Sequence, residues 1–185
     1  MTLNNSENEK LQGGLRLKKI FKKSTNQKPL ITIVTSVLNG EQYLEETILS
    51  VINQGYKNIE YIIIDGGSTD ATIDIIKKYE DSIDFWSSEK DQGIYYGFNK
   101  GLLQAGGDMI GFVNSDDILL ENAISTLVNY YNKYPKIDFI FGSVKKHWGI
   151  LHGYKPWKIF FSWGFYTSHS TGFFIKKEAA KIVGN

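Results

Sequence analysis

The spacing of hydrophobic residues changes repeatedly along the chain from residue 30 onward. The run 31–37 consists of apolar and β-branched residues, which is typical of a strand buried on both faces of a sheet. The segment 41–54 carries its apolar residues three and four positions apart, which is typical of a helix with one buried face. Such pairs of segments repeat as far as residue 144. We predict strands at 31–37, 59–64, 84–88, 109–113 and 138–144, and helices at 41–54, 71–79, 93–105 and 121–134.

Strands that alternate with helices of this length predict an α/β fold. In such a fold the central sheet is mostly parallel, helices cover both of its faces, and the crossovers are right-handed. A chain of 185 residues has the length of one domain. We place the start of this domain at residue 29, so that it comprises 29–185, with a regular part at 29–146 and a less regular part at 147–185.

The less regular part is rich in aromatic residues. One interpretation is that these large rings fill the second half of the core. The other is that some of them stack on a sugar or contact a lipid-linked partner. The residues are Trp148, Tyr154, Trp157, Phe160, Phe161, Trp163, Phe165, Tyr166, Phe173 and Phe174.

The first 28 residues differ in charge from the rest of the chain. They contain seven Lys or Arg and two Asp or Glu, whereas the other 157 residues contain 14 basic and 18 acidic residues. We therefore predict a flexible basic tail at 1–28. Leu17, Ile20 and Phe21 recur among its lysines at helical spacing, so the alternative is a helix that lies on a membrane surface.

Composition excludes some classes of protein. A chain without cysteine has no disulfide, no thiolate zinc site and no cysteine nucleophile. The mildly acidic balance of residues 29–185 argues against nucleic-acid binding. The chain has no apolar run of the roughly 20 residues that a membrane span needs, and no apolar stretch typical of a signal peptide. We expect a cytoplasmic protein, with the basic tail or the aromatic part providing any contact with the inner face of a membrane.

Polar and acidic residues directly follow three of the predicted strands, at 36–41, 65–70 and 114–117. Ligands of open α/β sheets bind at the carboxyl ends of the strands. Carboxylates that meet there repel each other unless a cation or a ligand lies between them. Asp116 and Asp117 offer the oxygen ligands that suit Mg²⁺ or Mn²⁺. An acidic pair in this place can also cap the next helix, and Asp70 is better explained as a helix cap.

Six motifs, in this order, resemble those of glycosyltransferase family 2, whose members are inverting enzymes with a GT-A fold. The resemblance covers about 29–177. It implies a nucleotide-diphospho-sugar donor, most often a UDP-sugar, and a glycan or lipid-linked acceptor whose hydroxyl receives the sugar during assembly of a surface polysaccharide. The motifs are TSVLNGE at 35–41, LSVINQ at 49–54, IDGGSTD at 64–70, SEKDQGIY at 88–95, NKG at 99–101 and GDMIGFVNSDD at 107–117.

The resemblance also implies a set of site residues. Asn114-Ser115-Asp116 occupies the place of the family's Asp-any-Asp motif, so Asp116 would be the main ligand of Mn²⁺ or Mg²⁺. Asp117 would be a second ligand or would support the first. Ser36, Asn39 and Glu41 would lie by the nucleotide, Asp65 would bind its base, and Asp91 and Gly93 would lie by the diphosphate or the donor sugar, with Asn114 and Ser115 beside them.

Inversion needs a base that takes the proton of the acceptor hydroxyl. In the family, this base follows the strand that corresponds to 172–175, and the present chain stops at about that point, which suggests truncation. His169 is the candidate base, or a metal ligand, although a structural histidine is the alternative. Glu178 is expected on a solvated helix face. The alternative function is a nucleotide-sugar-binding domain that lacks its base.

Two other enzyme classes share features of this pattern. A nucleotidyltransferase would need a basic loop after the first strand, where this chain has the acidic segment 38–41. A dinucleotide-dependent oxidoreductase would need spaced glycines in the same turn, so that a pyrophosphate can meet a helix N-terminus. We therefore favour the glycosyltransferase.

Overall fold

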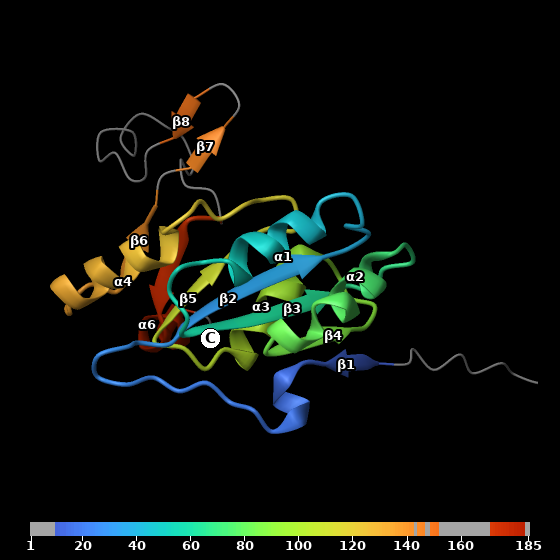
Figure 1. The fold of residues 1–185 in the computed structure, drawn as a ribbon, viewed down its shortest axis with the longest axis horizontal. Coiled ribbons are helices and arrows are strands. Elements are labelled where there is room, and N and C mark those ends of the chain that lie inside the picture. The colour runs from blue at the N-terminus through green and yellow to red at the C-terminus, as the bar shows by residue number, and fades with distance from the viewer. Residues whose placement is uncertain (1–9, 143, 147–148, 152–170, 184–185) are drawn as a thin grey trace, which may run out of the picture.

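The structure is a computed structural model and describes residues 10–142, 144–146, 149–151 and 171–183. Within these residues, seven strands form one sheet and two more form a hairpin (Figure 1). The sheet contains β1 (Leu11–Gly13), β2 (Ile31–Val37), β3 (Ile59–Asp65), β4 (Phe85–Ser88), β5 (Met109–Phe112), β6 (Phe139–Phe141) and β9 (Phe173–Lys176), and the hairpin contains β7 (Val144–Lys146) and β8 (Gly149–Leu151).

The helices follow the predicted pattern, with ends that differ by one to three residues. Helix α1, for example, begins after a turn at 41–43 rather than at residue 41. The described helices are α1 (Leu44–Ile52), α2 (Thr72–Lys78), α3 (Ile94–Gln104), α4 (Ala123–Lys133) and α6 (Lys177–Val183), with short 3-10 helices η1 (Leu15–Lys18) and η2 (Glu80–Ser82).

The strands of the sheet lie in the order β1-β4-β3-β2-β5-β9-β6. Neighbours among β4, β3, β2 and β5 are parallel, whereas β1 and β9 run antiparallel to their neighbours. The prediction of an α/β fold with a mostly parallel sheet is therefore confirmed. The register places Val37 opposite Asp65 and Asp65 opposite Ser88, so three strands end together at one edge.

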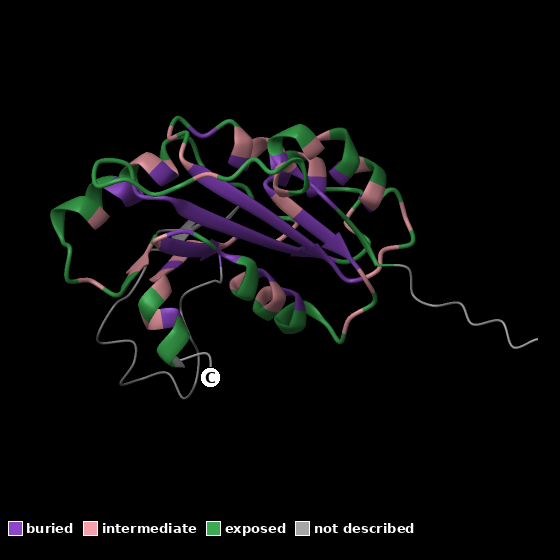
Figure 2. Ribbon diagram, turned by 90° about the horizontal axis from the view of Figure 1, so that it is seen from below, coloured by how far each residue is buried: buried purple, intermediate pink, exposed green. Residues whose placement is uncertain are grey.

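Alternation along the strands divides the core between the two faces of the sheet. Ile33 and its neighbours at odd positions in β2 pack with apolar residues of α1, α2 and α4, whereas Val34 packs with residues of α3. Every residue of β2 and β3 is buried between these layers (Figure 2). A Cβ at Gly101 would overlap the Val34 side chain, so this glycine lets α3 approach β2 closely.

The last part of the sheet differs from the prediction. The single strand expected at 138–144 is divided into β6 and β7, and β9 lies between β5 and β6. Phe174 of β9 is buried against Gly111, and the Phe173 ring contacts Phe139 and Phe141. The core interpretation therefore holds for Phe174, whereas Phe173 is only half-buried, and Trp148 and the seven aromatics at 154–166 lie outside the described residues.

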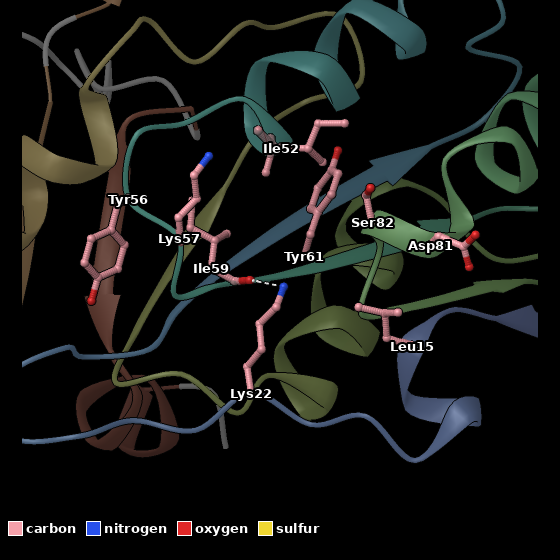
Figure 3. Close-up of a pocket in the computed structure, with 10 residues that line it drawn as sticks. Leu15, Lys22, Ile52, Tyr56, Lys57, Ile59, Tyr61, Asp81 and Ser82 are labelled. Atoms are coloured by element: carbon pink, nitrogen blue, oxygen red, sulfur yellow. Dashed lines mark hydrogen bonds between the residues drawn. The ribbon is translucent and has the colours of Figure 1, made fainter.

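Residues 10–28, which belong to the predicted flexible tail, contact the sheet in the structure. Strand β1 pairs with β4, and the Arg16 guanidinium lies 2.7 Å from Glu60 Oε1. Lys22 Nζ lies 2.7 Å from Asp84 Oδ2 and donates to the Ile59 carbonyl at 2.6 Å (Figure 3). Glu60 and Asp84 are buried, and buried carboxylates need cationic partners. This requirement holds the basic segment against the sheet.

The alternative for this segment, a membrane-surface helix that includes Leu17, Ile20 and Phe21, does not form in the structure. Helix η1 ends at Lys18, and Lys19 adopts a left-handed conformation with φ of 61°. In the described part of the chain, no helix is both long enough and apolar enough to cross a bilayer.

Candidate active site at the carboxyl edge of the sheet

The carboxyl edge of the sheet gathers the loops that carry the predicted site residues. Gly66 N donates to the Val37 carbonyl at 2.9 Å, which joins the ends of β2 and β3. A Cβ at Gly40 would lie 3.7 Å from Ser115 Oγ, so the loop after β2 also contacts the turn after β5. The loop after β2 therefore lies between the other two.

Asp65 ends β3 and is fully buried. Its Oδ2 accepts hydrogen bonds from Gly67 N and Ser68 N, both at 2.9 Å, and from Ser88 Oγ at 2.6 Å. Ser68 Oγ donates to the other oxygen. Gly67 has φ of 89°, which a residue with a side chain rarely adopts. Asp65 thus fixes the shape of the β3–α2 loop and ties it to β4.

Asn39 joins the β2–α1 loop to the β3–α2 loop. Its backbone N–H donates to Ser68 Oγ at 2.7 Å, and its Oδ1 accepts from Thr69 N at 2.9 Å. Its φ of 51° is in the left-handed region, which asparagine tolerates better than most residues. The asparagine side chain therefore supports both the turn and the contact between the loops.

Glu41 makes a second link between these loops. Its Oε2 accepts from Ala71 N at 3.0 Å, while its own N–H donates to Asp70 Oδ2 at 3.1 Å. Asp70 Oδ1 accepts from Thr72 N, the first residue of α2, at 3.0 Å, although the N-cap position of this helix is Ala71 and Asp70 lies one residue before it. Burial alone would raise the pKa of the Asp70 carboxyl, but the hydrogen bonds from Thr72 and Glu41 lower it.

Ser36 and Asp91 both lie close to Gly97 in the first turn of α3. A Cβ at Gly97 would overlap Ser36 Oγ and would lie 3.6 Å from Asp91 Oδ2. Asp91 Oδ1 accepts from Gly93 N at 2.8 Å, and Gly93, with φ of 117°, immediately precedes α3. Asp91 is also close to the β3–α2 loop, because a Cβ at Gly66 would lie 3.0 Å from Asp91 Oδ1.

Asp117 is held in place by hydrogen bonds. Asn114 Nδ2 donates to Asp117 Oδ2 at 2.7 Å, and Thr171 Oγ1 donates to the same oxygen. An aspartate at position 114 would place two carboxylates in contact here, whereas the asparagine supplies a donor. Thr47 Oγ1 lies 2.9 Å from the carbonyl oxygens of both Ser115 and Asp117 and so anchors the turn to α1.

Asp116 differs from its neighbour because its side chain is exposed. Its carboxylate has no hydrogen bond or ion pair within the part of the chain that the structure describes. In that same part, no three His, Cys, Asp or Glu side chains are grouped so that they could hold a metal ion. The oxygen atoms of Asp116 and Asp117 suit Mn²⁺ or Mg²⁺, but water or substrate phosphates would have to supply the remaining ligands.

A cavity of about 920 Å³ opens beside Asp116 and Asp117. Its walls come from α4, from the loop that precedes α4, and from β6 and β9. Most of its lining is apolar, and Thr171 contributes a hydroxyl next to the acidic pair. The apolar lining includes Ile118, Leu120, Leu127, Tyr130, Phe141 and Phe174.

Sequence reasoning missed three hydroxyl residues of this edge. Thr47 is buried on the inner face of α1, Ser88 ends β4, and Thr171 lies two residues before the start of β9. Ser88 begins one of the six motifs, and its position at a strand end was an available signal. Thr47 gave no such signal, because its partners lie about 70 residues further along the chain.

Of the two candidates for the base, the structure describes only Glu178. His169 lies outside the described residues. Glu178 is exposed on α6, as expected. Because Lys176 pairs with Met109, α6 follows at the amino end of β5, whereas Asp116 follows its carboxyl end. Glu178 and Asp116 are therefore at opposite edges of the sheet.

Solved structures of glycosyltransferases have the same fold. A mannosyltransferase from Pyrobaculum calidifontis, in complex with GDP-Man and Mn²⁺, matches 92% of this chain and 52% of its own with a TM-score of 0.67 and 16% identity. Staphylococcus aureus TarS 1-349, in complex with UDP-GlcNAc, matches 83% of this chain and 47% of its own with a TM-score of 0.65 and 17% identity. At these identities the likeness concerns the fold.

Curated relatives are more similar in sequence. An uncharacterized glycosyltransferase of Haemophilus influenzae is 41% identical over 105 residues, which is 55% of this chain and 42% of the relative. The putative teichuronic acid biosynthesis glycosyltransferase TuaG of Bacillus subtilis is 38% identical over 96 residues, or 50% of this chain and 38% of the relative. The chain thus spans less than half the length of these relatives. The model of Glycosyl transferase family 2 matches residues 32–182, and the chain belongs to this family.

Proposed function

We propose that this chain forms the donor-binding part of a metal-dependent inverting glycosyltransferase. The enzyme would move a sugar from a UDP-sugar to a hydroxyl of a glycan or lipid-linked acceptor during assembly of a surface polysaccharide. The observation that carries the proposal is the exposed Asp116 carboxylate on a turn fixed by Thr47, Asn114 and Thr171, at the same sheet edge as Asp65. The complexes of TarS with UDP-GlcNAc and of the mannosyltransferase with GDP-Man and Mn²⁺ support a nucleotide-sugar donor.

The difficult step in sugar transfer is departure of the nucleoside diphosphate. A divalent cation would neutralise the negative charge that develops on this leaving group. Asp116 would hold the cation, and Asp117, fixed by its hydrogen bonds, would support it. Ser36, Asp91 and Gly93 would lie along the donor at the start of α3, with Asn114 and Ser115 completing the opposite side.

Asp65, Asn39 and Glu41 would act on the nucleotide mainly through the loops that they hold. Both oxygens of Asp65 accept hydrogen bonds from the chain itself, so its first effect is to present the backbone of 66–69 in one conformation. A loop fixed in this way lowers the entropy cost of binding a base.

The base of the reaction is assigned to His169, which precedes Thr171 by two residues in the sequence. We favour His169 over Glu178 because Glu178 lies at the opposite sheet edge from Asp116. The apolar cavity beside Asp116 and Asp117 would take the acceptor. A second candidate function is a domain that binds nucleotide-sugar without turnover, and the place of Glu178 at the sheet edge opposite Asp116 favours it.

The proposal is tested by calorimetric titration of UDP, and of GDP in parallel, into the 185-residue chain with and without Mn²⁺. Nucleotide release from UDP-sugars is then measured on the same preparation. We expect Mn²⁺-dependent binding of UDP together with release of UDP. Binding without release would support the second candidate function. Preferential binding of GDP would indicate a GDP-sugar as the donor in place of a UDP-sugar. The absence of any nucleotide binding would contradict both functions.

Thr171 offers a sharper test of the acidic turn. Thr171→Val removes the hydroxyl that donates to Asp117, and a hydrogen bond to a charged group contributes about 1.5–3 kcal/mol. We expect affinity for UDP in the presence of Mn²⁺ to fall roughly tenfold, while binding without metal stays unchanged. Thr171→Ser keeps the hydroxyl and should behave like the original chain. Equal loss in both variants, or equal loss with and without Mn²⁺, would contradict this role.

A further inference from the structure

Three large apolar side chains lie exposed within five residues of the N-terminal segment. Leu17, Ile20 and Phe21 are 56%, 50% and 61% exposed. Single exposed apolar residues are common on protein surfaces, but adjacent ones mark sites of interaction. We propose that this N-terminal patch, formed by Leu17, Ile20 and Phe21, docks on the surface of a bilayer that contains anionic lipid.

The segment that carries the patch is anchored to the rest of the protein, although its three apolar residues do not lie on one regular α-helix. Leu15 N donates to the Ile83 carbonyl at 3.0 Å, and Arg16 N donates to the Asp84 carbonyl at 2.9 Å. After the patch, Lys22 is paired with buried Asp84. Burial raises the pKa of the Asp84 carboxyl, and the hydrogen bond from Lys22 opposes this shift. The segment is thus fixed on both sides of the patch, so docking would not require it to fold first.

Figure 3 shows one contact of this anchoring, the hydrogen bond from Lys22. Lys22 reaches the Ile59 carbonyl at the edge of a pocket of about 280 Å³, which Leu15 and Tyr61 also line. Leu15, unlike the patch, is only partly exposed. The segment therefore directs one apolar residue toward the protein and leaves the next three at the surface.

Charge around the patch favours an anionic surface as its partner. Residues 10–28 include seven Lys or Arg and no Asp or Glu. Lys18 is paired with Asp81, but the exposed Lys19 and Lys23 side chains have no ion pair among the described residues. A second copy of the chain would bring these lysines against each other in a symmetric contact, which is unfavourable. An anionic lipid surface can bury the apolar side chains of the patch and attract the lysines beside it.

The patch is separate from the candidate active site. Arg16 contacts Glu60 near the amino end of β3, whereas Asp65 ends that strand at its carboxyl edge. In Figure 1 the segment that carries the patch is the blue coil along the lower border of the molecule. Docking through the patch would therefore leave the carboxyl edge free, and the inference does not depend on the proposed function.

The test is co-sedimentation of the 185-residue chain with vesicles of phosphatidylcholine alone and of phosphatidylcholine with 30% phosphatidylglycerol. We expect binding to the anionic vesicles, at least tenfold weaker binding to the neutral ones, and a marked loss in 0.5 M NaCl. Leu17→Gln/Ile20→Gln/Phe21→Gln should reduce the partition coefficient at least tenfold. Lys19→Glu/Lys23→Glu should reduce it by a similar factor, since each lysine near an anionic surface contributes roughly fivefold.

The matched control is Leu103→Gln/Ile182→Gln, which removes two apolar side chains that are 85% and 80% exposed elsewhere. This variant should bind the vesicles like the original chain, and all variants should keep the same circular dichroism spectrum. Equal binding by the patch variant and the original chain would overturn the proposal. So would a change from dimer to monomer in the patch variant without lipid, since it would assign the patch to a second copy.

Discussion

Replacing Asp116 by alanine is expected to abolish Mn²⁺-dependent binding of UDP and to lower sugar transfer by about a hundredfold or more. The carboxylate is exposed and forms no hydrogen bond or ion pair in the described part of the chain, so the fold does not use it. Loss of one group that stabilises developing charge typically lowers kcat by about 10²–10³. The free energy of unfolding should change by no more than about 0.5 kcal/mol, as for other exposed residues.

Calorimetry with and without Mn²⁺, nucleotide release and urea denaturation measure these effects on one preparation. Glu121→Ala is the matched control, because Glu121 is an exposed carboxylate of the same loop and also borders the cavity. It should leave metal-dependent binding unchanged. If Asp116→Ala binds UDP with the same dependence on Mn²⁺ as the original chain, Asp116 is not a metal ligand.

The order of elements could be predicted because it depends on local periodicity. The run 31–37 is apolar or β-branched at nearly every position, and the structure buries it between α1 and α3. The edge at which the loops meet follows from the parallel strands alone. For this reason the sequence was enough to place Asn39, Asp65, Ser115 and Asp117 together.

What could not be predicted depends on contacts between distant residues. The pairing of β9 between β5 and β6 joins residues more than 30 positions apart. The sequence of the basic segment at 10–28 is typical of a flexible tail. Its partners, Glu60 and Asp84, are carboxylates whose burial becomes evident only in the folded chain. Likewise, no local pattern indicates that Thr171 donates to Asp117.

The role of Asp65 is the point at which the sequence and the structure suggest different experiments. The family resemblance implies a direct hydrogen bond to the nucleotide base. The structure adds hydrogen bonds from Gly67, Ser68 and Ser88 to this buried carboxylate. We therefore expect Asp65→Ala to lower the free energy of unfolding by about 3 kcal/mol, since buried donors left without an acceptor each cost about 1–3 kcal/mol.

Asp65→Asn separates the two roles. The amide keeps one oxygen for Gly67 N, Ser68 N and Ser88 Oγ but places a donor near Ser68 Oγ, so we expect an intermediate loss of about 1–2 kcal/mol. Urea denaturation measures this loss, and calorimetry measures UDP binding under conditions in which each variant is folded. If the loop alone matters, affinity should fall in the same order as stability. A folded Asp65→Asn variant of unchanged stability that no longer binds UDP would contradict the structural role, because only a direct contact with the base would then explain the loss.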